Sequence, residues 1–197
     1  NIEKYLLDWD TIVNDSKYAY EGSINVQLKF FNYVDYTVRY SAAHDAVFDT
    51  SEPTLLRAGV WLYQITGDEQ FLNNAGYIAD VIEEFYLYES GIVKPNHPFS
   101  NTVKVEEKHT NQEILSDVAN LALVNSNYVQ LTKTIADAVI EYEINHETEL
   151  FYTEVTLEGE PIDNFMDISY GGSAGLESLL LAYEVTSDVV YLDQVKR

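Results

Sequence analysis

A repeat within the chain limits the possible folds more than any other feature of this 197-residue sequence. Three windows of 22 residues align without a gap, and they cover residues 51–72, 110–131 and 171–192. In each window a helical segment of about 15 residues is followed by a polar turn. After the turn comes a short aromatic or Val-rich segment that ends in Leu. This pattern predicts a helix, a tight turn and the start of a second helix, three times over.

The second helix of the unit is repeated as well. Residues 78–85 (IADVIEEF) resemble residues 135–142 (IADAVIEY). The first helices are apolar on most sides, as expected for helices enclosed by neighbours, whereas the second carry an acidic outer stripe. A capping box from Thr110 to Glu113 agrees with one of the helix starts. We therefore predict helical hairpins over about 51–88, 110–146 and 171–197.

Long connections join the hairpins, and stretches with strand character lie in them at residues 23–40, 91–105 and 149–157. The last of them alternates apolar and polar residues and runs into Glu158–Pro161, which indicates a short strand and a turn. Residues 2–14 resemble an outer helix whose inner partner is missing. The predicted fold is all-α, with short strands in the connections at one end, as a single domain or segment over residues 1–197.

The turns at residues 66–72 and 186–192 follow the pattern Thr-(Gly/Ser)-Asp-x-x-(Phe/Tyr)-Leu. Hairpins of about 60 residues with such a turn resemble the (α/α) toroid of six-hairpin carbohydrate-active enzymes. Unsaturated uronyl hydrolases, glucuronyl C5 epimerases and N-acylglucosamine epimerases share this arrangement of helical hairpins. The resemblance covers nearly the whole chain, but it is one of architecture, because the turn motif carries no chemistry.

A complete toroid of this kind has twelve helices, whereas about seven are visible in this sequence. Half a ring would leave inner-helix surface exposed, at a cost of roughly 25 cal/mol per Å² of apolar area. We therefore expect this chain to be part of a longer protein. The remaining hairpins would come from that longer chain or from a partner subunit.

The chain is strongly acidic, with 33 Asp and Glu against 11 Lys and Arg and a formal net charge of −22. Such a surface repels phosphate backbones and anionic lipids, so we expect neither nucleic acid nor a membrane as a partner. It suits a halophilic protein or simply solubility. The absence of Cys excludes a thiolate nucleophile and a disulfide framework. We expect a cytoplasmic protein, or a secreted or cell-surface one if the native N-terminus lies upstream.

The resemblance implies a cleft at the N-terminal ends of the first helices, lined by the connections. Glycoside hydrolysis needs one carboxyl group that donates a proton and one that is ionised. Asp45 or Asp49 from one connection and Asp167 from another could supply this pair. In so acidic a chain, such residues also serve as solvated charges or helix caps. The preferred hypothesis is a glycoside hydrolase that acts on a glycan containing uronic acid.

Sugar epimerisation or isomerisation is the first alternative, since it removes a proton next to a carboxylate or carbonyl group. His109 and Tyr170 suit the acid and base roles, and Arg57 could hold a carboxylate in a bidentate contact. An ion pair with Glu177 is the competing role for Arg57. The further candidates for substrate binding are His44, Asn111, Glu113 and Glu177.

A non-catalytic module, whose concave face binds a glycan or a protein, is the second alternative. His44, Asp45 and Asp49 include possible ligands for Ca²⁺, but the sequence has no EF-hand pattern and no HExxH. We therefore expect a carbohydrate as the substrate, and neither a metal nor a cofactor.

Overall fold

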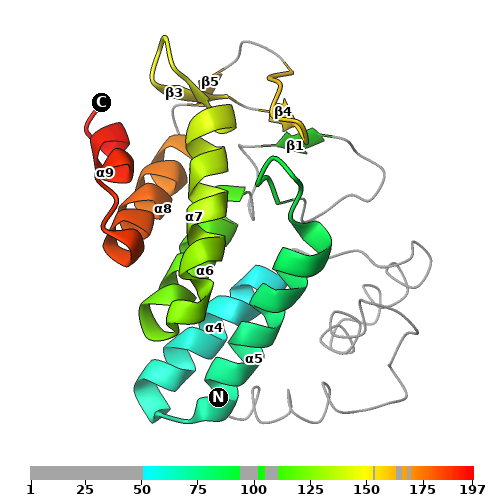
Figure 1. The fold of residues 1–197 in the computed structure, drawn as a ribbon, viewed down its shortest axis with the longest axis vertical. Coiled ribbons are helices and arrows are strands. Elements are labelled where there is room, and N and C mark those ends of the chain that lie inside the picture. The colour runs from blue at the N-terminus through cyan, green and yellow to red at the C-terminus, as the bar shows by residue number, and fades with distance from the viewer. Residues whose placement is uncertain (1–50, 94–101, 105–110, 153, 163–165, 168–169) are drawn as a thin grey trace, which may run out of the picture.

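The structure is a computed structural model that describes residues 51–93, 102–104, 111–152, 154–162, 166–167 and 170–197 (Figure 1). Its helices are α4 (Ser51–Thr66), α5 (Glu69–Val81), α6 (Asn111–Val124), α7 (Val129–Ala138), α8 (Tyr170–Thr186) and α9 (Val189–Val195). Shorter helical segments are η3 (Ile82–Tyr86), η4 (Ser126–Tyr128) and η5 (Val139–Glu143). The predicted helix at 2–14 and the connection at 23–40 lie outside the described residues.

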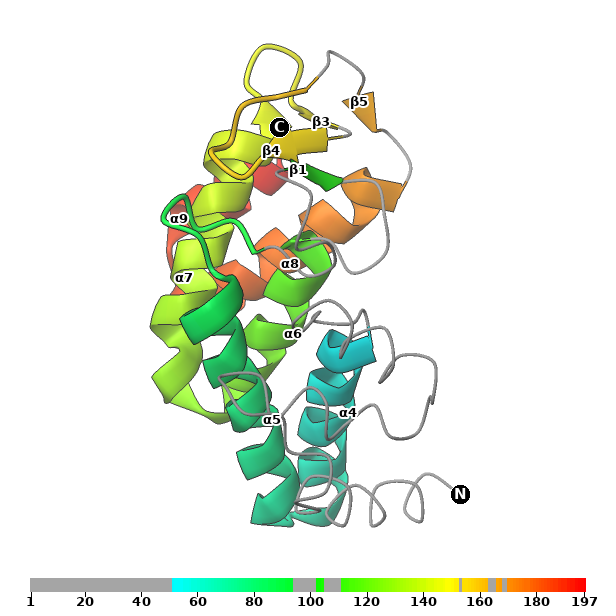
Figure 2. The same ribbon diagram turned by 90° about the vertical axis from the view of Figure 1, so that its right-hand side faces the viewer.

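The helices form three hairpins that stand side by side in two layers. Helix α4 packs on α5, α6 on α7, and α8 on α9, while α6 lies between α4 and α8 and contacts both. Figures 1 and 2 show α4, α6 and α8 in an inner layer and α5, α7 and α9 in an outer one. The predicted fold class, repeated helical hairpins of an (α/α) toroid, is confirmed by this arrangement and by the similar structures described below.

The polar turn between inner and outer helix explains the repeated Thr-(Gly/Ser)-Asp pattern. The Thr66 hydroxyl donates to the Leu62 carbonyl at 2.6 Å and accepts from the Asp68 N–H at 3.2 Å. The Asp68 carboxylate then caps α5 by accepting from the Gln70 N–H at 3.0 Å. The residue between Thr and Asp has a positive φ, 71° at Gly67 and 58° at Ser187, which favours glycine. The pattern is thus a local stop-and-cap signal.

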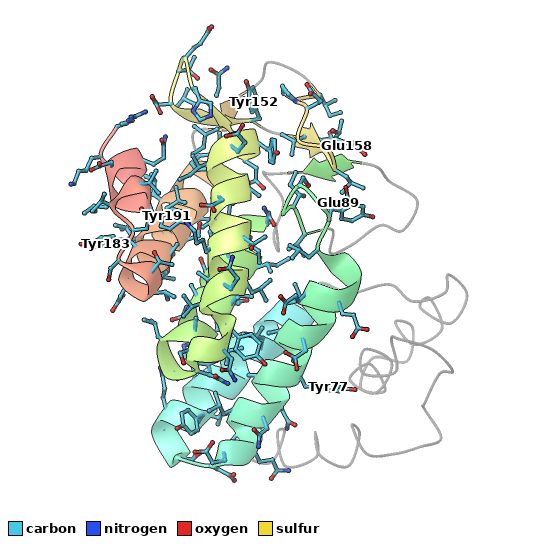
Figure 3. All side chains as sticks on the ribbon, viewed as in Figure 1. Tyr77, Glu89, Tyr152, Glu158, Tyr183 and Tyr191 are labelled. Carbon is cyan, nitrogen blue, oxygen red and sulfur yellow. The ribbon has the colours of Figure 1, made fainter. Side chains whose placement is uncertain are left out.

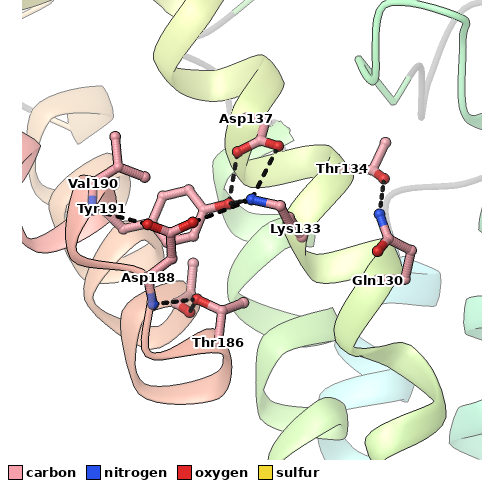
Figure 4. Close-up of polar contacts among 9 residues, drawn as sticks. Gln130, Lys133, Thr134, Asp137, Thr186, Asp188, Val190 and Tyr191 are labelled. Carbon is pink, nitrogen blue, oxygen red and sulfur yellow. Dashed lines mark hydrogen bonds and ion pairs between the residues drawn. The ribbon is translucent and has the colours of Figure 1, made fainter.

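The outer helices also repeat in three dimensions. Both α5 and α7 continue into a π-helical segment, η3 and η5, at the positions where the two sequences resemble each other. The Tyr128 hydroxyl donates to Asp80 Oδ1 at 2.9 Å. In the next hairpin the Tyr191 hydroxyl donates to Asp137 Oδ1 at 2.6 Å (Figure 4), and Figure 3 shows where Tyr191 lies in the molecule. Each tyrosine therefore joins the start of one outer helix to the preceding outer helix.

Short antiparallel strands lie at the end of the bundle where α6 and α8 begin (Figure 2). Strand β1 (Thr102–Lys104) pairs with β4 (Glu154–Thr156), and β3 (Leu150–Tyr152) lies between β2 (Ile144–Asn145) and β5 (Met166–Asp167). The single strand predicted over 149–157 is divided into β3 and β4, because its two halves pair with different strands. The predicted turn follows, with Gly159 at a φ of 91°.

The apolar core lies between the two layers. Leu56, Ile114, Leu121, Ile135 and Leu179 are fully buried, and each such side chain stabilises the fold by about 1.5–3 kcal/mol. Helix α6 is enclosed on nearly all sides, as the sequence predicts. Helices α4 and α8 have one inner neighbour each among the described residues, and they leave apolar side chains on the surface, namely Trp61, Ile65, Leu176 and Leu180. Within the described part of the chain, no helix has the length and apolar character needed to cross a bilayer.

Candidate functional site

A pocket of about 210 Å³ lies among the three inner helices. Its lining residues are Arg57 and Trp61 from α4, Glu113, Ser116 and Asn120 from α6, and Ala174 and Glu177 from α8. Spacings of three or four residues place these side chains on one face of each helix. The lining comes mainly from the N-terminal halves of the inner helices, which is the end where the sequence predicts a cleft.

A buried ion pair lies beside the pocket. The Arg57 Nε donates to Asp117 Oδ1 at 2.5 Å, and so links α4 to α6. The Asp117 side chain is 2% exposed, whereas the Arg57 side chain is 37% exposed. The Nε edge of the guanidinium is therefore held by a carboxylate in the protein interior, while the side chain still lines the pocket.

Burial dominates the electrostatics of this pair. It raises the pKa of Asp117 to about 7, although Arg57 acts in the opposite direction, and the charges of Glu113 and Glu177 raise it further. For Arg57, burial acts to lower the pKa, but the nearby carboxylates outweigh it and leave the pKa above its ordinary value. Arg57 stays a cation, whereas Asp117 titrates close to neutral pH.

A second buried acid, Glu143, lies in the core at the end of η5. The Gln112 Nε2 donates to Glu143 Oε2 at 3.1 Å. Burial raises the pKa of Glu143 to about 7, and the hydrogen bond from the Gln112 amide opposes this rise. Among the described residues, Asn111 Nδ2, Gln112 Oε1 and Glu143 Oε1 have no hydrogen-bond partner. Glu143 is completely buried, so this cluster is separate from the open pocket.

The structure brings three of the predicted site residues together, since Arg57, Glu113 and Glu177 all line the pocket. Arg57 forms its ion pair with Asp117 rather than with Glu177. Asn111 is fully buried, and its Oδ1 accepts from the Val93 N–H at 2.9 Å, so it holds the chain before β1 instead of lining the pocket.

The other predicted residues lie at the edge of the described structure or beyond it. Asp167 is in β5, where its backbone pairs with Phe151, and Tyr170 is the first residue of α8, but neither side chain is described. His44, Asp45, Asp49 and His109 lie outside the described residues. Among the residues with described side chains, no group of three or more His, Asp or Glu could hold a metal ion.

Sequence reasoning missed part of the pocket. Trp61 lies one helical turn after Arg57, and Ser116, Asp117 and Asn120 lie one or two turns after Glu113. Helical spacing from the two predicted residues would have found these neighbours. One turn further along the same helices, the surface becomes apolar, with Ile65, Leu123 and Leu180 exposed. The inner face thus has a polar half, which holds the pocket, and an apolar half.

Comparison with known proteins supports the fold. No family model matches the sequence, and no curated protein matches it. Among solved structures, a D-mannose isomerase has a TM-score of 0.62 at 13% identity, and the match covers 75% of this chain and 38% of that one. An inactive α-1,6-mannanase variant of Salegentibacter sp., in complex with α-1,6-mannotriose, has a TM-score of 0.61 at 16% identity, with coverages of 95% and 56%.

A cellobiose 2-epimerase from Bacillus thermoamylovorans is similar to the same degree, with a TM-score of 0.60 at 13% identity and coverages of 95% and 56%. The matches therefore span between 38% and 56% of these three chains. At such low identity the likeness concerns the fold. It confirms the expected resemblance to (α/α)-toroid carbohydrate-active enzymes.

Proposed function

We propose that this chain belongs to a carbohydrate-active enzyme and that the pocket between α4, α6 and α8 binds a sugar unit of its substrate. The observation that carries the proposal is the composition of the pocket. The Trp61 side chain is 54% exposed, and its ring offers a flat apolar surface for the C–H groups of a sugar. Two carboxylates, an amide and a hydroxyl group beside it suit the hydroxyl groups of the same sugar.

Hydrolysis of a glycosidic bond is the reaction that we propose first. It requires two carboxyl groups, and Glu113 and Glu177 bring one each to the pocket from neighbouring helices. Asp45 or Asp49 with Asp167 is the other pair, which the sequence places in the connections. If the connections supply the catalytic pair, Glu113 and Glu177 bind the sugar, and their loss raises KM more than it lowers kcat.

Epimerisation or isomerisation of a free sugar is the second candidate. The observation in its favour is Arg57, a cation fixed by Asp117 at the pocket wall, because a positive charge stabilises the oxyanion that forms when a carbon next to a carbonyl loses its proton. His109 and Tyr170 are the proposed acid and base for this reaction.

A uronic acid is the substrate that the sequence suggests for hydrolysis. Its carboxylate would need the terminal N–H groups of Arg57, because the Nε already binds Asp117. Binding of a uronate would also place a third negative charge near Glu113 and Glu177. The uronic-acid hypothesis therefore requires the terminal N–H groups of Arg57 to bind the substrate carboxylate, and turnover of trigalacturonate in the experiment below would support it.

The experiment that tests the function uses the full-length protein with two kinds of substrate. Release of reducing ends is measured with α-1,6-mannotriose and with trigalacturonate, and exchange of sugar protons in D₂O is measured by NMR with mannose. We expect turnover in one assay and at least a tenfold loss of kcat/KM in Glu113→Gln and Glu177→Gln. Glu184→Gln is the matched control, because Glu184 is an exposed residue of α8 outside the pocket.

The other possible results of these assays would change the proposed function. Binding of these sugars without turnover would support the non-catalytic glycan-binding module in place of an enzyme. Turnover that is unaffected by either pocket variant would place the site elsewhere. The absence of both binding and turnover would reject the proposed function.

A further inference from the structure

Acidic side chains outnumber basic ones at the pocket within the described part of the chain. Two carboxylates, Glu113 and Glu177, line the pocket together with one cation, Arg57. The remaining lining residues are uncharged, namely Trp61, Ser116, Asn120 and Ala174. The described wall of the pocket is therefore negative before any charge on Asp117 is counted.

The single cation of this wall is already engaged. Arg57 Nε is bound to Asp117, which is buried behind it. The charges of Glu113 and Glu177 also act on the guanidinium. A carboxylate on the ligand would have to share this cation with three protein carboxylates, whereas a positive ligand group would meet an excess of acceptors.

Glu177 is the carboxylate best placed to receive a positive ligand group. It is exposed on α8 and lines the pocket, and no ion pair or hydrogen bond holds its carboxylate in the described structure. Trp61, which lines the same pocket from α4, presents an exposed aromatic ring, which attracts cations as well as the C–H groups of sugars. The pocket thus combines a sugar platform with a site for a cation.

We infer that this pocket selects a sugar unit that carries a protonated amino group, such as a hexosamine, over a neutral sugar and over a uronic acid. The inference rests on the proposed sugar-binding function and specifies its substrate class. The ammonium group pairs with Glu177 while the ring packs on Trp61. Because Glu177 is exposed, this contact contributes up to about fivefold in affinity at low salt and less as salt screens it.

The test compares binding of three trisaccharides to the full-length protein at pH 6 by titration calorimetry. Triglucosamine and tri-N-acetylglucosamine share a skeleton and differ in the charge of the amino group, whereas trigalacturonate carries the opposite charge. We expect triglucosamine to bind up to about fivefold more tightly than its acetylated form, and trigalacturonate to bind most weakly. Glu177→Gln should remove the preference for triglucosamine, because it lowers the affinity for triglucosamine more than the affinity for the acetylated form.

Controls separate the pocket from the general charge of the protein, because a chain with a net charge of −22 attracts any cation. Glu184→Gln also removes one carboxylate from α8, but at a position away from the pocket. This variant should keep the preference for triglucosamine over its acetylated form. If triglucosamine binds best but Glu177→Gln has no effect, the attraction is non-specific and the inference fails.

The outcomes distinguish this inference from the proposed function. Equal affinity for triglucosamine and its acetylated form would overturn the inference while sugar binding stands. Tightest binding of trigalacturonate would overturn it in favour of the uronic-acid hypothesis. If none of the three trisaccharides binds, and the two enzyme assays also show no turnover, the proposed function itself fails.

Discussion

Two clusters in this molecule each surround a cation with acidic side chains, yet they lie in opposite environments. On the inner face, Arg57 binds the buried Asp117 beside the pocket. On the outer face, Lys133 of α7 lies 3.5 Å from Asp137 Oδ2 and 3.3 Å from Asp188 Oδ2 (Figure 4). The Asp117 side chain is 2% exposed, whereas those of Asp137 and Asp188 are 51% and 41% exposed.

At the inner carboxylate, the effect of burial on the pKa outweighs the effect of the cation. Burial raises the pKa of Asp117 to about 7 although Arg57 opposes this. The pKa of Asp188 is lowered, first by the N–H of Val190 at the helix cap and then by Lys133, and these effects outweigh the opposing effect of burial. The Arg57–Asp117 ion pair therefore carries a large desolvation cost and depends on its geometry. The ion pairs of Lys133 on the outer face are exposed to water and salt, and they contribute little to stability.

The largest expected effect comes from removing the inner cation. Arg57→Met leaves the buried carboxylate of Asp117 without its partner, and we expect a loss of about 3 kcal/mol in the free energy of unfolding at pH 8, measured with urea. This value is the lower end for buried pairs, because the Arg57 side chain is 37% exposed. The double variant Arg57→Met/Asp117→Leu should recover most of the loss. If the double variant does not recover this loss, Arg57 stabilises the folded state through the packing of its side chain and not through its charge.

The pH dependence of stability should differ between the two environments. The pKa values of Asp117 and Glu143 are about 7 in the folded protein and near 4 in the unfolded chain. The folded state therefore binds more protons between these values, and the free energy of unfolding falls as the pH rises from about 4 to about 7. Glu143→Gln should reduce this fall by up to about 3 kcal/mol.

Asp188 should act in the opposite direction, since its lowered pKa makes its contribution disappear as the pH falls through that pKa. Urea unfolding of Glu143→Gln and Asp188→Asn between pH 3 and 8 checks both signs. An unchanged slope between pH 4 and 7 in Glu143→Gln would contradict the assignment of a protonated acid in the core.

A smaller effect is expected from the outer tyrosine, and it concerns a hydrogen bond rather than a charge. The Tyr191 hydroxyl donates to Asp137 at 2.6 Å, and the ring is fully buried. Tyr191→Phe should lower the free energy of unfolding by about 1 kcal/mol. Tyr128→Phe is the matched variant in the preceding hairpin, where the hydroxyl donates to Asp80. A loss at one position only would show that the two contacts are equivalent in sequence but not in energy.

The smallest effect is expected for the outer cation itself. Lys133→Met should change the free energy of unfolding by less than about 0.5 kcal/mol, and 1 M NaCl should remove the difference. The Lys133 side chain is 39% exposed, so water replaces its ion pairs when it is lost. A loss as large as that of Arg57→Met would show that exposure does not govern these clusters.

Much of the fold could be predicted from the sequence because its signals are local. The Thr-(Gly/Ser)-Asp turn stops one helix and caps the next within three residues, as Thr66 and Asp68 show. The repeat of this signal with similar spacing fixes the series of hairpins. By contrast, the division of residues 149–157 into two strands depends on pairing partners that are distant in the sequence, such as β1 and β5.

The candidate site was predictable only in part. The sequence by itself determined that Arg57, Glu113 and Glu177 lie in the N-terminal halves of inner helices, because helix starts are encoded by neighbouring residues. Only the tertiary structure decided that Arg57 meets Asp117, which is 60 residues away, and that Glu177 does not take this place. The rotation of α4, α6 and α8 about their axes makes that choice, and it is set by how their apolar side chains pack together.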